Sequence, residues 1–260
     1  MPNVTKPAEL SIVVPTYNER HRLGDLVHTI FQAFAAEGLD GELVIVDDNS
    51  PDGTGAVADE LASTRRVTVI HRAGKLGLGT AVVEGFNAAS APVVGVIDAD
   101  LSHPPQMLPR MLATMRREGA DMVIGSRYIP GGGTSDWGIG RLLMSRAACL
   151  LARGVTPVKD ATSGFFLIRR DLARTVAISA GGFKICLELL VRGRPAVVVE
   201  VPYVFQARTA GESKMNLREA LGYLSQLTSL RAFTRRQPPL RQRYQRVTAG
   251  QLQREPLARS

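Results

Sequence analysis

The chain has 260 residues, of which 45% are hydrophobic and 22% charged, with a formal net charge of +8, a balance typical of a globular protein with a full core. The composition excludes a membrane-spanning protein, because no apolar run approaches the ~20 residues that such a helix requires, and no signal peptide opens the chain. The only cysteines, Cys149 and Cys186, lack metal-ligand spacing and are too few to staple a secreted fold, so we expect a cytoplasmic protein with reduced thiols.

Short β-rich runs alternate with longer amphipathic stretches between Leu10 and Ile124. The runs are LSIVVP, ELVIVDD, VTVIH, VVGVIDAD and DMVIG. This alternation predicts an α/β fold with a mostly parallel, Rossmann-like sheet flanked by helices. Ligands of such sheets bind beyond the carboxyl ends of the strands, where the polar clusters PTYNE, DDNSPDGT and DADLSH stand. We therefore expect these three loops to converge on one crevice.

The next part of the chain, residues 130 to 164, is expected to form a wall of that crevice. It begins with the glycine-rich PGGGTSDWG, continues through a helix from Ile139 to Arg153 and ends at DATSGF. Two further strand-like runs, GFFLI and AVVVEVPYVF, then extend the sheet with mixed directions. Together, residues 1–216 are predicted to form one catalytic domain.

The last segments are set apart by their composition. Apolar residues recur near helical spacing over 217–236, which predicts an amphipathic helix that either packs on the core or lies in a membrane interface. Residues 235 to 260 hold seven arginines against one acid, a net charge of +6, which leaves +2 for the body. We expect 237–260 to be a basic, disordered tail, which either finds anionic lipid or is simply solvated.

A pair of carboxylates, Asp98 and Asp100, directly follows the apolar run VVGVI. Side chains at i and i+2 of a strand end can turn together toward a divalent cation, and hard oxygen ligands suit Mg²⁺ or Mn²⁺. Such a cation neutralises a pyrophosphate leaving group. The alternative is that the pair only shapes a turn or caps a helix.

The second polar cluster, VDDNSPDGT, also follows a buried run. Carboxylates there can accept hydrogen bonds from base N–H groups and ribose hydroxyls, and we choose Asp48 for a nucleotide contact. Turn formation and helix capping explain Ser50, Asp52 and Thr54 in part.

Seven motifs, in order, resemble the inverting family 2 glycosyltransferases, and within them the dolichol-phosphate mannose synthases and related polyprenyl-phosphate sugar transferases. The resemblance covers about residues 10 to 218. The motifs are PTYNE (15–19), VDDNSPDGT (46–54), KLGLGTA (75–81), DADLSHPP (98–105), GSRYIPGG (125–132), SGFFLIRR (163–170) and GESKMN (211–216).

The resemblance implies a GT-A fold, a GDP-mannose donor, a Mg²⁺ or Mn²⁺ cofactor, and a polyprenyl or dolichyl phosphate acceptor. It implies no nucleic acid partner. It also assigns roles to residues. The nucleoside would be held by Pro15, Tyr17, Glu19, Val46 and Asp48, and the metal and diphosphate by Asp98 and Asp100, with Ala99 between them. Ser163 would contact the transferred sugar, and the donor and acceptor phosphates would be bound by Arg127, Arg146, Arg208 and Lys214.

Two features depart from that pattern. Some family members carry glutamine as an extra metal ligand where this chain has Ser102, and some continue into transmembrane helices where this chain has a basic tail. Attachment to the cytoplasmic face of a membrane would then be peripheral or depend on a separate anchoring subunit. Of the remaining candidates, His103 is expected to be a loop or supporting histidine, and Glu188 either positions the acceptor or forms a structural pair.

We therefore predict transfer of mannose from GDP-mannose to polyprenyl phosphate by a single inverting displacement. A UDP-glucose donor with the same lipid acceptor stays open, because the fold and the metal site do not encode which sugar is recognised. A catalytically idle adaptor at a membrane surface also stays open. The partial Gly77-Leu78-Gly79 motif has Val82 at its third glycine position, so a nicotinamide dehydrogenase is disfavoured.

Overall fold

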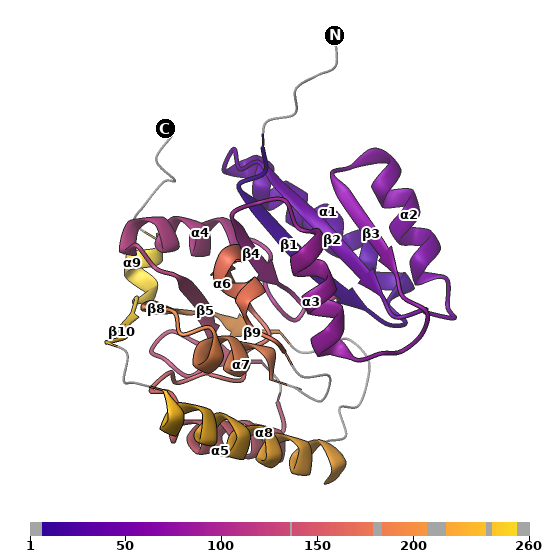
Figure 1. The fold of residues 1–260 in the computed structure, drawn as a ribbon. Helices are drawn as coiled ribbons and strands as arrows, with labels where there is room; N and C mark the ends of the chain where they lie inside the picture. Colours follow the sequence, from indigo (N-terminus) through magenta and orange to yellow (C-terminus); the bar gives the residue numbers. More distant parts are fainter. Residues whose placement is uncertain (1–6, 136, 179–183, 207–216, 238–240, 254–260) are drawn as a thin grey trace.

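The computed structural model describes residues 7–135, 137–178, 184–206, 217–237 and 241–253, and Figure 1 shows their arrangement. The strands are β1 (Leu10–Thr16), β2 (Gly41–Asp47), β3 (Val67–His71), β4 (Val93–Val96), β5 (Met122–Ser126), β6 (Gly133–Thr134), β7 (Phe166–Arg169), β8 (Val197–Pro202), β9 (Val204–Phe205) and β10 (Arg243–Arg246). The helices are α1 (Arg20–Ala36), α2 (Thr54–Thr64), α3 (Leu78–Ala88), α4 (Met107–Glu118), α5 (Ile139–Ala152), α6 (Arg170–Thr175), α7 (Ile185–Arg192), α8 (Leu217–Arg236) and α9 (Ala249–Gln253).

Eight strands form one sheet in the order β10-β8-β5-β7-β4-β1-β2-β3. All neighbouring pairs are parallel except those of β7, which runs antiparallel to both β4 and β5. A second, two-stranded sheet joins β6 to β9. The predicted α/β architecture and the mixed strand directions after residue 164 are confirmed.

The sheet carries a hydrophobic core on each face. One core contains the apolar residues of α1 and α4 together with Ala58 of α2 and Leu252 of α9. The other contains those of α3 and α7, with buried residues of α5 and α8. Successive strand residues point to opposite faces, so Val13 and Val14 of β1 belong to different cores. Burial on both faces explains why the strands are continuously apolar.

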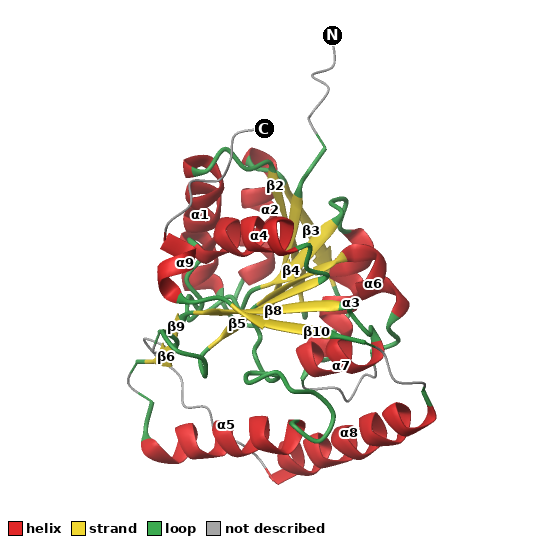
Figure 2. Ribbon diagram, turned by 90° about the vertical axis from the view of Figure 1, so that its left-hand side faces the viewer, coloured by secondary structure: helices red, strands yellow, loops and turns green. Residues whose placement is uncertain are grey.

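Helices α5 and α8 both lie below the sheet, as Figures 1 and 2 show, and they contact each other. Tyr223 of α8 donates a hydrogen bond of 2.6 Å from its hydroxyl to the carbonyl oxygen of Ala148 on α5. Tyr223, Leu227 and Leu230 are buried, so one face of the predicted amphipathic helix packs on the core. In the part of the chain that the structure describes, no helix is long and apolar enough to cross a membrane.

Residues 241–253 form regular secondary structure, in contrast to the disordered tail predicted for 237–260; residues 238–240 and 254–260 lie outside the described residues. Strand β10 pairs in parallel with β8 and completes the edge of the main sheet, and α9 follows it. Val247 and Leu252 are buried beside the core. The composition of the segment did not indicate this strand, because backbone pairing with β8 and the two apolar residues stabilise it, while Arg241, Arg243 and Arg246 are exposed.

Candidate active site

Three loops meet at the carboxyl ends of β1, β2 and β4. Each contains a non-glycine residue in the left-handed backbone region: Asn18 (φ 62°), Asn49 (φ 56°) and Leu101 (φ 61°). Asparagine tolerates this conformation, whereas for leucine it is strained. Strained backbone concentrates at functional sites, and Leu101 places such strain in the loop that follows β4.

Hydrogen bonds tie the first two loops together. The backbone N–H of Asn18 donates to the Ser50 hydroxyl over 3.0 Å, and that of Glu19 donates to the Thr54 hydroxyl over 2.9 Å. Asp52 accepts from the Thr54 N–H over 3.0 Å, a turn just before α2, whose N-cap residue is Gly53. Glu19 is thereby held at the start of α1.

The carboxylate of Asp48 lies buried at the end of β2 and is engaged by two groups of the protein. Arg72 donates to it through Nη1, and the backbone N–H of Gly77 donates over 3.2 Å. Arg72 also reaches Glu84 and Thr80 on α3, over 3.2 and 2.5 Å. Asp48 therefore joins the loop after β2 to the loop before α3. Arg72 was not predicted from the sequence, where its only signal is its place directly after VTVIH.

The remaining nucleoside candidates surround the same edge of the sheet. Pro15 is half-buried within β1, and Val46 is fully buried in β2 between β1 and β3. The ring of Tyr17 is 37% exposed, and the Nζ of Lys75 stands 3.9 Å from its centre. A cation and an aromatic ring at this edge suit a diphosphate and a planar base; Lys75 opens the motif KLGLGTA, although no role was predicted for it from the sequence.

The two carboxylates of the DAD motif lie one turn beyond β4. Asp100 is 7% exposed and accepts a hydrogen bond from the Ser102 N–H over 3.0 Å, and Ala99 between them is buried. The Asp98 side chain is about one-third exposed, and a Cβ added to Gly164 would stand 3.4 Å from its Oδ1. Gly164 thus leaves room beside the carboxylate.

These residues fit a divalent cation that is shared with a substrate. Within the described ranges, no group of three histidine, cysteine or acidic side chains could hold a metal by itself. Mg²⁺ commonly takes only one or two carboxylates and completes its shell with phosphate oxygens and water. The Ser102 hydroxyl, two residues after Asp100, is buried and has no hydrogen-bond partner. Its oxygen is therefore a further candidate ligand for the cation.

His103 is a supporting residue, in line with the expectation. It is 1% exposed, stacks on Phe165 with 5.1 Å between ring centres, and packs against Tyr203 and Phe205. Burial lowers the pKa of its imidazole, although the charges of nearby Asp98 and Asp100 act to raise it. The Asp98 N–H donates to its Nδ1 over 3.3 Å, so a neutral ring holds the DAD loop.

Arg127 is held by a buried ion pair with Asp160. Its Nε and Nη2 each donate over 2.7 Å to the two carboxylate oxygens, and its backbone N–H donates over 2.9 Å. Burial alone would lower the pKa of the guanidinium, but the charge of Asp160 outweighs it and raises that pKa. A bidentate pair fixes the plane of the guanidinium, so Arg127 is oriented before any substrate arrives.

Glu200 of β8 stabilises the Arg127–Asp160 ion pair through hydrogen bonds to neighbouring groups. It is 3% exposed and accepts hydrogen bonds from the Asp160 N–H over 3.1 Å and from the Ser126 hydroxyl over 2.8 Å. Arg246 of β10 stands 3.6 Å from the same carboxylate. The C-terminal strand therefore contacts the network that positions Arg127.

Two hollows meet at Arg127. The first, which we call the Asp98 crevice, has a volume of ≈ 230 Å³ and is lined by Asp98, His103, Ser163 and Gly164 among others. The second, the α5–α8 groove, has a volume of ≈ 420 Å³ and lies between those two helices. Arg127, Trp137, Arg141, Thr162 and Lys184 line both.

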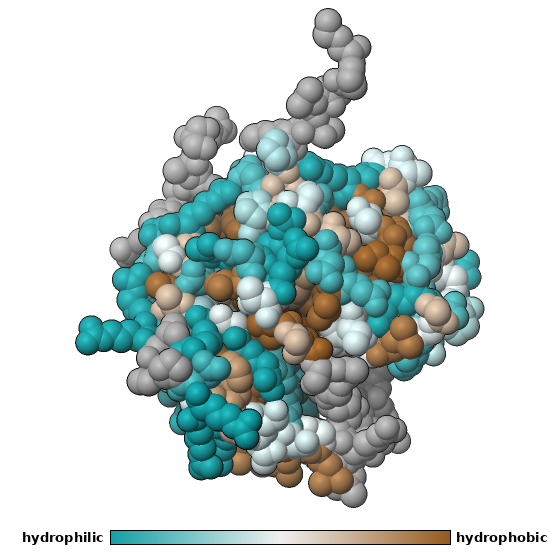
Figure 3. Space-filling view, in the orientation of Figure 1, coloured by the Kyte–Doolittle hydropathy of each residue, from teal (hydrophilic) through white to brown (hydrophobic). Residues whose placement is uncertain are grey.

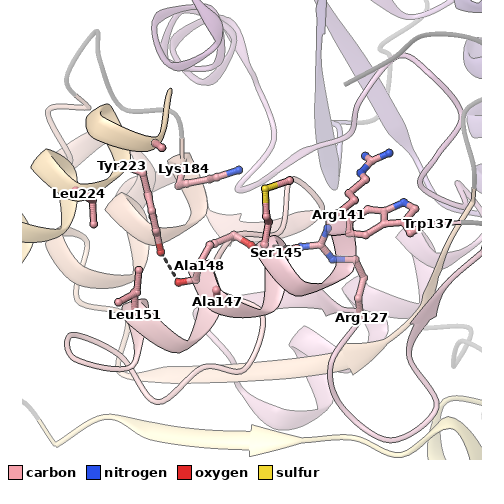
Figure 4. A pocket seen from close by; sticks show the side chains of 13 residues that line it. Arg127, Trp137, Arg141, Ser145, Ala147, Ala148, Leu151, Lys184, Tyr223 and Leu224 are labelled. Carbon is pink, nitrogen blue, oxygen red and sulfur yellow. Dashed lines mark hydrogen bonds between the residues drawn. The ribbon is translucent and has the colours of Figure 1, made fainter. Parts of the chain in front are cut away.

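The α5–α8 groove has a cationic end and an apolar end. Figure 4 shows Arg127 and Arg141 beside Trp137 at one end, Leu151, Tyr223 and Leu224 at the other, and Lys184 between them. The Arg141 guanidinium stands 4.1 Å from the centre of the Trp137 ring. Arg141 and Lys184 were not predicted from the sequence, since nothing in their local sequence distinguishes them from other basic residues.

The other predicted phosphate contacts do not join this junction. Arg146 lines a separate hollow on the far side of α5, because the helix turns its side chain away from α8. Glu188 is buried and accepts from Arg192 over 2.6 Å and from Gln226 over 3.0 Å, so it is the structural pair rather than an acceptor contact. Arg208 and Lys214 lie outside the described residues. Ser163 lines the same hollow as Asp98, and its contact with the transferred sugar stays a prediction.

A mostly parallel sheet with a carboxylate pair at its switch point, next to a cation-lined junction, defines a GT-A glycosyltransferase. The model of the glycosyl transferase family 2 matches residues 11–177, and the chain belongs to this family.

Curated relatives support the narrower resemblance. The chain is 41% identical over 226 residues to a dolichol-phosphate mannosyltransferase of Pyrococcus furiosus, covering 85% of this chain and 63% of that protein. It is 36% identical to a protein of the same name from Saccharomyces cerevisiae (86% and 88% covered) and 39% identical to a polyprenol monophosphomannose synthase of Mycolicibacterium smegmatis (85% and 87%). The chain thus spans less than two thirds of the Pyrococcus relative.

Solved structures share the fold. Glucosyl-3-phosphoglycerate synthase of Mycobacterium tuberculosis, solved with Mn²⁺, UDP-glucose and phosphoglyceric acid, superposes with a TM-score of 0.63 at 20% identity, over 86% of this chain and 80% of that one. The same synthase with Mg²⁺ and UDP gives 0.61 at 21% identity, over 86% and 78%. At this identity the likeness shows the fold alone.

Proposed function

We propose that the protein transfers mannose from GDP-mannose to a polyprenyl or dolichyl phosphate at a membrane surface, with inversion at the anomeric carbon. The names of the relatives at 36–41% identity support this lipid-linked reaction. The observation that carries the proposal is the junction of the Asp98 crevice with the α5–α8 groove, through shared cations.

The donor fits the loops at the carboxyl ends of the strands. Tyr17, Glu19 and the segment Val46–Asp48 would hold the nucleoside, and Asp98 and Asp100 would hold Mg²⁺ or Mn²⁺ together with the diphosphate. When bound, the cation supplies charge that stabilises the departing diphosphate. Ser163 and Gly164 leave space beside Asp98 for the sugar.

The acceptor fits the α5–α8 groove because both have a charged end and an apolar end. Its phosphate would lie at the end lined by Arg127, Arg141 and Lys184, and its isoprenoid chain would run along Leu151 and Leu224. Arginine binds phosphate oxygens through a fork of N–H groups, and lysine acts as a point charge. The three cations bring two mutually repelling phosphorylated substrates together.

The chemical step is one in-line displacement. An oxygen of the lipid phosphate bonds to the anomeric carbon while the bond from that carbon to the diphosphate oxygen breaks, and the nucleotide diphosphate leaves with the electron pair. A phosphate monoester has its second pKa near ~6, so the acceptor arrives as an anion and needs no base. His103, buried among aromatic rings, fits this absence of a base.

The test is transfer of labelled sugar into the organic phase, with purified protein, polyprenyl phosphate and Mg²⁺ or Mn²⁺. GDP-mannose and UDP-glucose are offered in parallel. We expect transfer from GDP-mannose alone, lost with EDTA and with Asp100→Ala, and retained by Asp59→Ala, which removes an exposed carboxylate that pairs with His71.

Other results would replace the proposal. Transfer from UDP-glucose alone would keep the mechanism and change the sugar. No lipid product from either donor, with folded protein and added membranes, would favour the adaptor or a required membrane-anchoring subunit.

A further inference from the structure

Hydrophobic side chains gather on the outside of α5 rather than in the core. Leu143 and Leu150 are 60% and 61% exposed, and Ile139 is 78% exposed. Residues four and seven apart share one face of a helix, so these three form a single apolar stripe. Figure 3 shows hydrophobic residues along the lower edge of the molecule, where Figure 1 places α5 and α8.

Basic residues border this stripe on the side away from the α5–α8 groove. Arg146 and Arg153 are exposed, and since they are also seven residues apart, they lie two turns apart along the same edge of the helix. A long cationic side chain beside an apolar helix face can extend to the level of lipid headgroups while that face enters the membrane. The geometry is therefore that of an interfacial helix.

A hollow of ≈ 330 Å³ opens at this edge, and we call it the Arg153 hollow. It is lined by Tyr128, Arg146, Cys149, Leu150, Arg153 and Lys159. Across the described part of the chain, no carboxylate forms an ion pair with Arg146, Arg153 or Lys159, although Arg146 stands 5.9 Å from the centre of the Tyr128 ring. Three positive charges thus converge on a concave surface.

We propose that the Arg153 hollow binds the phosphate headgroup of an anionic membrane lipid while Leu143 and Leu150 enter the bilayer. The site lies on the opposite side of α5 from the α5–α8 groove and shares no lining residue with the Asp98 crevice. It is a docking site for bulk lipid, separate from the acceptor, and it does not depend on which sugar is transferred.

Charge and shape select this occupant. The three cations match a phosphodiester, and the leucines beside them match its acyl chains. A protein partner with an acidic patch would satisfy the cations but would leave the apolar stripe to be covered separately. The bilayer satisfies both features at once.

The first experiment measures partitioning to vesicles, without sugar donor, acceptor or metal, so its failure is distinguishable from failure of the proposed reaction. Wild type, R146Q/R153Q and R110Q/R174Q are compared on vesicles of phosphatidylcholine with and without phosphatidylglycerol. The second pair removes the same charge from exposed positions on α4 and α6.

Each basic residue at an anionic surface changes partitioning about five-fold, so we expect R146Q/R153Q to lose roughly 20-fold on anionic vesicles and the matched pair about two-fold or less. Both pairs should melt like wild type. Equal losses from the two pairs, or the same loss on neutral vesicles, would overturn the proposal.

A second measurement tests the hollow itself. We expect anionic vesicles to protect Lys159 from acylation, read by mass spectrometry, and to leave Lys75 at the opposite loop unchanged. If inorganic phosphate protects Lys159 fully and vesicles add nothing, the hollow binds free phosphate and the assignment to a lipid is wrong.

Insertion of the stripe is measured with a polarity-sensitive dye on Leu143→Cys. The native thiols do not compete, because burial raises the pKa of Cys149 to about 11 and that of Cys186 well above its ordinary value. The emission should shift to the blue on anionic vesicles, whereas the dye on Arg110→Cys should not respond. If the emission of the dye on Leu143→Cys does not shift, the stripe does not enter the bilayer and the proposal is wrong.

Discussion

The two halves of the site are built in different ways. The donor half consists of three loops that follow β1, β2 and β4, and hydrogen bonds between neighbouring loops, such as Asn18 to Ser50, hold it rigid. The acceptor half draws Arg127, Arg141 and Lys184 from segments far apart in sequence and sets them against the apolar residues of two helices. The donor half is therefore encoded in local motifs, and the acceptor half in packing.

The largest expected effect comes from the donor half. Asp98→Asn should lower kcat by on the order of 10³-fold, because a neutral amide no longer helps to hold the cation that stabilises the diphosphate. Activity is measured with both substrates saturating. The same loss with Asp59→Asn, an exposed carboxylate outside the crevice, would mean that the measurement reports general damage.

The next effect falls on the junction between the halves. Asp160→Asn leaves the Arg127 guanidinium without its counter-charge, and breaking a buried ion pair costs about 3–5 kcal/mol of the free energy of unfolding. We expect a lower Tm and, in the folded fraction, a larger rise in KM for the lipid than for the nucleotide-sugar. Equal rises for both substrates would show that Arg127 does not distinguish the halves.

A smaller effect separates the apolar end of the groove from the rest. Leu224→Ser should raise KM for a long polyprenyl phosphate roughly ten-fold, since a leucine that the bound lipid covers contributes about 1.5 kcal/mol to binding. KM for the donor should stay unchanged. Leu221→Ser is the matched control, because Leu221 is exposed on the same helix but does not line the groove. The groove does not hold the lipid if the two variants behave alike.

The smallest effect concerns pH. Burial lowers the pKa of Lys184, and the positive charge of Arg127 lowers it further. Lys184 therefore loses its charge at a lower pH than an ordinary lysine, so KM for the acceptor should rise about three-fold as the pH is raised from neutral toward 10, with no change for the donor. Lys184→Arg should abolish this dependence, because arginine stays charged.

Much of the donor half could be read from the sequence because its chemistry is contiguous. Asp98 and Asp100 follow VVGVI directly, and a parallel sheet brings the ends of its strands to one edge regardless of the details of packing. Arg72 was not predicted from the sequence because its chemistry is not contiguous. Its role depends on its ion pair with Asp48, which follows β2 and is 24 residues away in the sequence, so no local motif indicates it.

The prediction for Arg146 failed on orientation. Residues on α5 that are a few positions apart face either the groove or the far side, and sequence alone did not reveal which side α8 would cover. Arg141 and Arg146 are five residues apart and therefore point in different directions. The docking of α8, held by Tyr223 on Ala148, decides which arginine meets the acceptor.

What the sequence by itself determined is the alternation of strands and helices, the family, and the positions of the donor loops, because hydrophobic periodicity and turn residues act over a few neighbours. Only the tertiary structure decided the cation-lined junction, the Arg153 hollow and the place of β10 beside β8. These features depend on sheet edges and helix faces that meet only after the chain has folded. The local sequence around a charged residue does not indicate which residue it will contact in the folded protein.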